Sequence, residues 1–102
     1  MSASLPFGVQ QRLLERTLRR TAASLREVRD ELRILDEQLE FVESDLADKE
    51  LRAMVSETPF AAYEHNDARR HVEVMRTQRE RLVGRLRDLE REQDAALDRL
   101  GS

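Results

Sequence analysis

The fold is decided by two stretches of the chain: residues 25–46, LREVRDELRILDEQLEFVESDL, and residues 68–89, ARRHVEVMRTQRERLVGRLRDL. In both stretches apolar residues recur at alternating spacings of three and four, which is the heptad pattern of a helix packed along one neighbour. The pattern continues outside the quoted stretches, so each helix has ten seam positions that face the other helix. The first helix contributes Leu14, Leu18, Thr21, Leu25, Val28, Leu32, Leu35, Leu39, Val42 and Leu46. The second contributes Ala68, Val72, Met75, Arg79, Leu82, Leu86, Leu89, Gln93, Ala96 and Leu100.

The two sets of seam positions pair in reverse order. Each position in the first helix has a counterpart in the second such that the two residue numbers add to 114, for all ten pairs. This is the pairing expected of an antiparallel helical hairpin that turns near residue 57. We therefore predict an all-α fold: a single hairpin domain over residues 1–102, with a first helix over about 8–55, a turn over 56–59 and a second helix over about 59–100.

Local signals in the turn support two separate helices. Thr58 followed by Pro59 reads as an N-cap and a proline at the first helical position, where the missing N–H costs nothing. Pro59 also disfavours a helical conformation at Thr58, so one continuous helix is not expected. Gly101 stands where a helix commonly ends.

Charged residues beside the seam agree with this register. In an antiparallel pair they should face one another as Glu31 with Arg85, Asp45 with His71, Arg52 with Glu64, Glu43 with Arg69, and Asp36 with Arg76. None of these five pairs is a like-charge clash. Exposed ion pairs contribute only about 0.2–1 kcal/mol each, so their main effect is on the choice of register.

Two layers of the seam are polar. Thr21 is paired with Gln93, and a mutual hydrogen bond would satisfy both side chains. Arg79 is paired with Leu35 and is within reach of Asp36, while its methylene groups lie along the seam. Arg79 is either a residue that fixes the register or a ligand-binding residue, and we favour the first interpretation.

A second set of apolar residues lies outside the seam. Ile34, Phe41 and Val55 share one heptad position in the first helix, and Phe60 and Val74 share the same position in the second. Antiparallel pairing puts both rows on one side of the hairpin, with Phe41 near Val74 and Val55 near Phe60. Exposed apolar residues that align in this way mark an interaction surface.

The turn is apolar as well, because Leu51, Met54 and Tyr63 lie close to it in the sequence. These side chains either close the end of the hairpin or bind a partner. We predict that seven residues bind a protein partner: Ile34, Phe41, Met54, Val55, Phe60, Tyr63 and Val74. The first partner to consider is a second copy, which would give a homodimer with a four-helix bundle.

The opposite end of the hairpin and the charge distribution also bear on assembly. Phe7 continues the seam but has no counterpart within the 102 residues, so it either folds over Leu100 or meets another chain. Residues 36–67 carry ten acids and two bases, a net charge of −8, whereas the remaining residues have a net charge of +5. Opposite ends of two copies would therefore attract one another.

Composition and motifs exclude several classes of function. The chain has no cysteine, and its basic residues are seventeen arginines and one lysine, a bias typical of GC-rich bacterial coding sequences. Phosphate-binding loops, nucleophile elbows and zinc-protease motifs are absent, so we expect neither an enzyme nor a bound cofactor. Arginines alternate with acids and the net charge is −3, which disfavours nucleic-acid binding. With no apolar run of about 20 residues and no signal peptide, we expect a cytoplasmic protein without a membrane span.

One cluster has metal-ligand chemistry. Asp67 and His71 are one helical turn apart, Asp45 is predicted opposite them, and His65 is nearby. A structural zinc site needs four converging ligands, so we interpret the cluster as a carboxylate–histidine ion pair and predict no metal. Two helices without a concave pocket are also not expected to bind a small-molecule substrate.

The predicted function is a non-catalytic, structural or scaffolding module that self-associates. The alternative is a regulatory adaptor of the bacterial transcription machinery, since long helical hairpins occur in the secondary-channel factors of RNA polymerase and in coiled-coil anti-sigma factors gated by cyclic di-GMP. Glu40 and Ser44 resemble the start of the nucleotide-binding motif of the anti-sigma factors. Ala47 and Leu51 stand where that motif has arginine and glutamine, so nucleotide binding is not implied.

Overall fold

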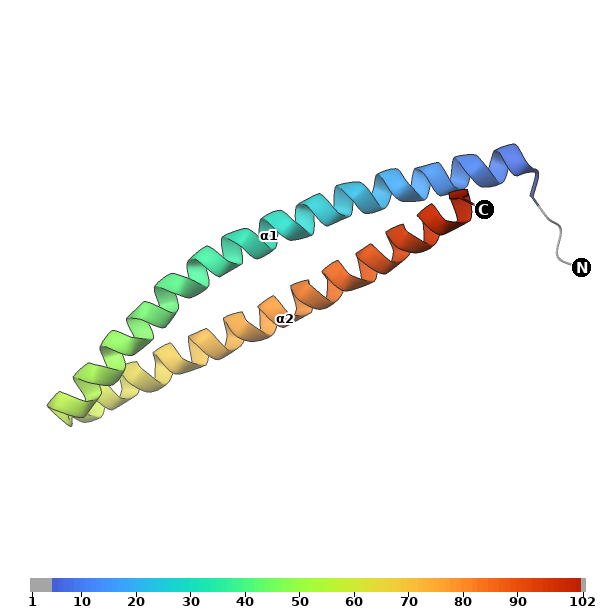
Figure 1. Cartoon of the computed structure of the whole chain (residues 1–102). Coiled ribbons are helices and arrows are strands. Elements are labelled where there is room, and N and C mark those ends of the chain that lie inside the picture. Colours follow the sequence, from blue (N-terminus) through green and yellow to red (C-terminus); the bar gives the residue numbers. More distant parts are fainter. Residues whose placement is uncertain (1–4, 102) are drawn as a thin grey trace, which may run out of the picture. The chain divides into compact units, whose positions relative to one another are not determined.

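The computed structural model describes residues 5–101, which form two helices, α1 (Phe7–Ser56) and α2 (Pro59–Gly101). The helices pack antiparallel as a helical hairpin, with the turn between Ser56 and Pro59 (Figure 1). The predicted all-α hairpin is therefore confirmed, and each predicted helix boundary lies within one residue of the observed one.

Both helices begin with backbone or side-chain caps. The Pro6 carbonyl accepts hydrogen bonds from the backbone N–H groups of Val9 and Gln10, each at 3.0 Å. At the start of α2 the Thr58 hydroxyl oxygen accepts a hydrogen bond from the Ala61 N–H at 3.1 Å, which confirms the predicted N-cap. These bonds satisfy donors that have no partner inside the helix.

The end of α1 has a feature that the sequence did not predict. Glu57 has a φ of 49°, the only positive φ of a non-glycine residue within residues 5–101. Its N–H donates to the Ala53 carbonyl at 3.3 Å, which is the bond of a left-handed helix cap. Glycine is the usual residue there because it has no Cβ to clash, so Glu57 is strained.

The hairpin divides into two compact units, the terminal unit (Met1–Asp30 with Gly84–Ser102) and the turn unit (Glu31–Val83). The turn unit has a buried apolar core of Leu35, Leu39, Val72 and Met75, of which Val72 is only 1% exposed. Val42, Leu46 and Leu82 pack against this core from both helices. Beyond it, Ala61 is buried and Ala53 is half-buried, so the seam continues to the turn.

The terminal unit has a different interior. Leu25, Val28 and Ala96 are buried, and between them Thr21 is fully buried. The Thr21 hydroxyl lies 2.9 Å from the Thr17 carbonyl and 3.1 Å from the Leu18 carbonyl, both in its own helix. This back-bonding replaces the predicted hydrogen bond to Gln93, because a threonine in a helix has carbonyls of the preceding turn within reach.

Both units confirm the predicted seam. All twenty seam residues are buried or half-buried, five pairs in each unit. The apolar spacing therefore identified correctly which face of each helix is covered.

Ion pairs beside the seam follow the prediction only in part. Arg79 donates to Asp36 at 2.6 Å, as predicted, and this hydrogen bond together with the carboxylate charge raises the pKa of Arg79. The predicted pair of Arg52 with Glu64 is present at 3.9 Å. Because Arg79 already occupies Asp36, Arg76 pairs with Glu43 at 3.2 Å, and the predicted pairs of Asp36 with Arg76 and Glu43 with Arg69 are wrong.

Two further predicted pairs have other outcomes. Asp45 pairs with Lys49 of the same helix at 3.0 Å, not with His71, because Lys49 lies one turn away. Glu31 and Arg85 belong to different units, and their pair stays a prediction. In the terminal unit, Arg20 and Glu92 form an ion pair between the helices. Neither helix, over residues 5–101, contains a segment that is long and apolar enough to cross a membrane.

Candidate protein-binding surface

The seven residues predicted to bind a protein all belong to the turn unit, and all seven are exposed. Their exposed fractions run from 47% for Ile34 to 80% for Phe41. Leu51 is exposed as well and adds an eighth large apolar side chain. Such residues are ordinarily covered, so this unit presents an unusual amount of apolar surface to solvent.

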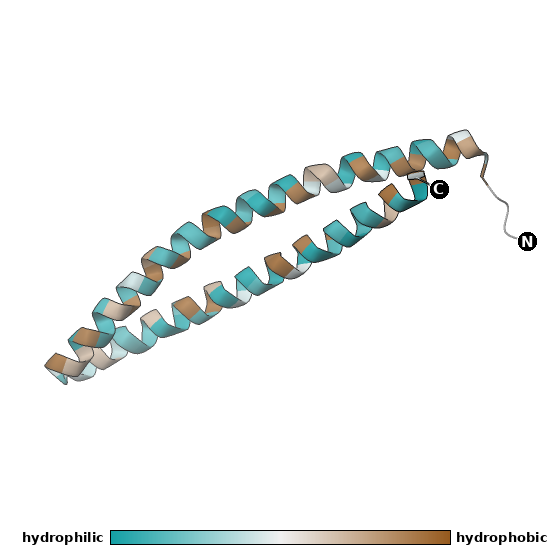
Figure 2. Ribbon diagram, in the orientation of Figure 1, coloured by the Kyte–Doolittle hydropathy of each residue, from teal (hydrophilic) through white to brown (hydrophobic). Residues whose placement is uncertain are grey.

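The exposed residues form two groups by position along the helices. The lateral patch comprises Ile34 and Phe41 of α1 and Val74 of α2. The tip patch surrounds the turn and comprises Leu51, Met54, Val55, Phe60 and Tyr63, and Figure 2 shows hydrophobic residues gathered there. The predicted proximity of Phe41 to Val74, and of Val55 to Phe60, stays a prediction.

Both patches include shallow depressions, each formed by a single helix. One surrounds Val74 on α2 and is lined also by Arg70, Glu73, Thr77, Gln78 and Arg81. Another is lined on α1 by Asp48, Leu51, Arg52, Val55 and Ser56. Neither encloses a volume from two sides, so these depressions suit the side chains of another protein better than a small molecule.

A polar layer separates the tip from the core of the turn unit. Lys49 takes the next seam position after Leu46, and its counterpart under the 114 rule is the half-buried His65. The hydrogen bond to Asp45 raises the pKa of Lys49, and the charges of Glu64 and Asp67 act in the same direction. This layer could have been predicted from the sequence, because the seam pattern extends to residues 49 and 65.

The candidate metal cluster has no converging ligands. Asp67 lies 3.7 Å from Arg70 and Asp45 lies 3.0 Å from Lys49, so neither predicted acid pairs with His71. Within residues 5–101 no three histidine, cysteine or acidic side chains are grouped to hold a metal ion. Each acid is paired with a base of its own helix.

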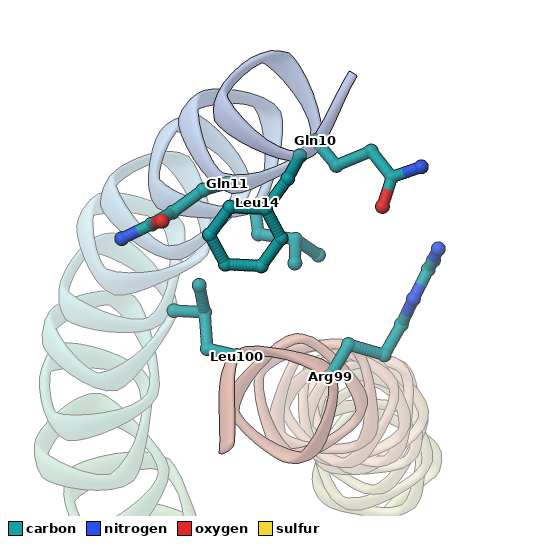
Figure 3. A pocket seen from close by; sticks show the side chains of 6 residues that line it. Gln10, Gln11, Leu14, Arg99 and Leu100 are labelled. Carbon is teal, nitrogen blue, oxygen red and sulfur yellow. The ribbon is translucent and has the colours of Figure 1, made fainter. Parts of the chain in front are cut away.

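The terminal unit contains a cavity of about 320 Å³ where the hairpin is open. Its lining residues are Phe7, Gln10, Gln11, Leu14, Arg99 and Leu100. Leu14 of α1 and Leu100 of α2 point toward one another across the cavity, and Gln10 and Arg99 lie along one side (Figure 3). Phe7 and Leu100 line the same cavity, but Phe7 remains 77% exposed, so its predicted contact with Leu100 or with another chain stays a prediction.

No protein-family model, curated protein or solved structure matches this chain. The role of the hairpin therefore has to follow from its own surface, in which large exposed apolar side chains are consistent with a partner-binding interface.

Proposed function

We propose that this hairpin is a non-catalytic protein-interaction module that self-associates through the lateral patch and serves a structural or scaffolding role. The observation that supports this proposal is the exposure of Phe41, a residue that is 80% exposed, together with exposed Ile34 and Val74 in the same unit. A residue as apolar as phenylalanine gains free energy when a partner removes it from water.

A second copy is the partner that the charges favour. Residues 36–67 have a net charge of −8, and the remaining residues have a net charge of +5. Two copies that pair in opposite directions bring unlike charges together, and a two-fold axis lets the same patch serve both chains. Two hairpins joined in this way form a four-helix bundle.

The expected affinity is moderate. Full burial of three large apolar side chains from each copy would give about 1.5–3 kcal/mol per residue. Association itself costs about 4–15 kcal/mol in lost translational and rotational freedom. Because the gain and the cost are of the same order, we expect a dimer whose population depends on concentration.

Light scattering coupled to size-exclusion chromatography, over a wide range of protein concentrations, tests this proposal. We expect the mass to rise with concentration to that of a dimer or higher, and we expect Phe41→Asp to lower the mass at each concentration while circular dichroism shows the same helicity. Phe41→Leu is the matched control, since it keeps an apolar side chain at this position, and it should still dimerise.

A monomer at every concentration would contradict self-association, and so would a Phe41→Asp variant with the mass of the parent protein. The exposed patches would then have to serve a different protein, as the regulatory-adaptor alternative requires. In that case the transcription machinery would be the first place to look for the partner.

A further inference from the structure

The two ends of the hairpin expose different kinds of apolar surface. At one end is the tip patch, with Phe60 69% exposed in the first turn of α2. At the other end the terminal unit has the cavity of about 320 Å³, which exposed Phe7 helps to line, and the same unit also exposes Leu5, Leu13 and Leu97. The cavity volume lies near the lower limit of ligand-binding pockets, about 300 Å³, so it can admit a large side chain.

The charges at the two ends are opposite. Residues 48–67, which contain the tip patch, carry five acids and two bases, a net charge of −3. The open end, residues 5–20 with 94–101, carries five arginines and three acids, a net charge of +2. Two tips would repel each other, and so would two open ends, whereas a tip and an open end attract.

We propose that the tip patch of one copy docks on the open end of a second copy, with Phe60 or Tyr63 entering the cavity between Phe7 and Leu100. The contact is head-to-tail, because it joins two different surfaces of the same chain. A contact of this kind leaves one tip and one open end unoccupied in every complex, so further copies can add to it. It rests on the proposed self-association only in taking a second copy as the partner, since it uses neither Phe41 nor Val74.

Two substitutions separate the two surfaces. Phe7→Asp blocks the open end and Phe60→Asp blocks the tip, because each puts a charge in the middle of an apolar contact. Both positions are exposed, and each lies in the first turn of a helix that has no acidic residue there. A carboxylate added in the first turn interacts favourably with the helix dipole. Both variants should therefore keep the fold, which circular dichroism checks.

The experiment is sedimentation velocity in the Phe41→Asp background, which removes the lateral contact. The Phe41→Asp protein, which is the parent in this experiment, should form species whose mass increases with protein concentration and decreases with added salt. Phe7→Asp alone and Phe60→Asp alone should each weaken this association by roughly tenfold or more. An equimolar mixture of the two should restore a complex of two chains and no larger one, because the intact tip of the first variant meets the intact open end of the second.

Two results would overturn the head-to-tail contact. If the mixture stays monomeric while the parent associates, then the tip and the open end do not bind one another. If either variant alone associates like the parent, the contact is tip-to-tip or lies elsewhere. Neither result bears on the lateral dimer, which the comparison of the unmodified chain with Phe41→Asp decides separately.

Discussion

The turn unit and the terminal unit follow the same heptad rule but are packed differently. In the turn unit Leu35, Leu39, Val72 and Met75 form a buried apolar cluster. In the terminal unit the buried positions include the polar Thr21, and the leucines at positions 14, 18, 86, 89 and 100 are only half-buried. Regular spacing thus sets which residues face each other, whereas the residue types in each layer decide how completely water is excluded.

The difference in burial should be visible in stability. Leu39→Ala, in the core of the turn unit, should lower the free energy of unfolding by about 2–5 kcal/mol, because it removes buried methylene groups and leaves a cavity. The same substitution at the half-buried Leu86 of the terminal unit should cost about half as much, since that side chain keeps part of its contact with water. Urea denaturation followed by circular dichroism measures both values. Equal losses would mean that the two units are equally well packed.

The turn unit also depends on its helix cap. Thr58→Ala removes the hydroxyl that accepts the Ala61 N–H at 3.1 Å, and it should cost about 0.5–2 kcal/mol. Thr77→Ala is the control, because Thr77 is exposed within α2 and alanine is the better helix former there. Thermal melts should show the first variant destabilised and the second unchanged or slightly stabilised. Equal melting temperatures for the two variants would mean that the Thr58 cap does not stabilise the protein.

The polar layer of the terminal unit gives the smallest expected effect. Thr21→Val replaces a buried hydroxyl that bonds only to carbonyls of its own helix, so the stability should change by less than about 1 kcal/mol, in the stabilising direction. Thr17→Val, at a half-buried position beside the seam, is the matched substitution for comparison. A clear loss of stability in Thr21→Val alone would mean that the Thr21 hydroxyl contributes to stability, contrary to this prediction.

The seam could be predicted from the sequence, whereas the details beside it could be predicted only in part. Apolar spacing identified the seam, because burying a stripe of leucines is the dominant free energy in a two-helix fold. The pair of Asp36 with Arg79 followed from the seam, but the choice of Arg76 for Glu43 did not, since several long side chains can reach one carboxylate and their energies are nearly equal. The left-handed conformation of Glu57 escaped prediction because no glycine or asparagine marks it.

The positions of the exposed apolar residues could be predicted from the sequence, but the partner that covers them could not. Ile34, Phe41 and Val74 could be placed outside the seam by counting, and the structure shows all three exposed. The partner that covers these residues is determined by the shape and charge of its own surface. A single sequence describes that surface only if the partner is a second copy of the same chain. For this reason the opposite charges of the two ends carry more weight than any one apolar residue.

The reverse pairing of the helices also sets an order of events in folding. Because paired positions add to 114, partners are separated by 8 residues at Ala53 and Ala61 and by 86 residues at Leu14 and Leu100. Short loops cost the least entropy to close, so we expect the capped turn to form first and the seam pairs to form in order of increasing sequence separation. The last contacts to form would then be those around the Phe7–Leu100 cavity, and hydrogen exchange during refolding would report that sequence of steps. In that case a nascent chain could not complete its open end before Arg99 and Leu100 had been synthesised.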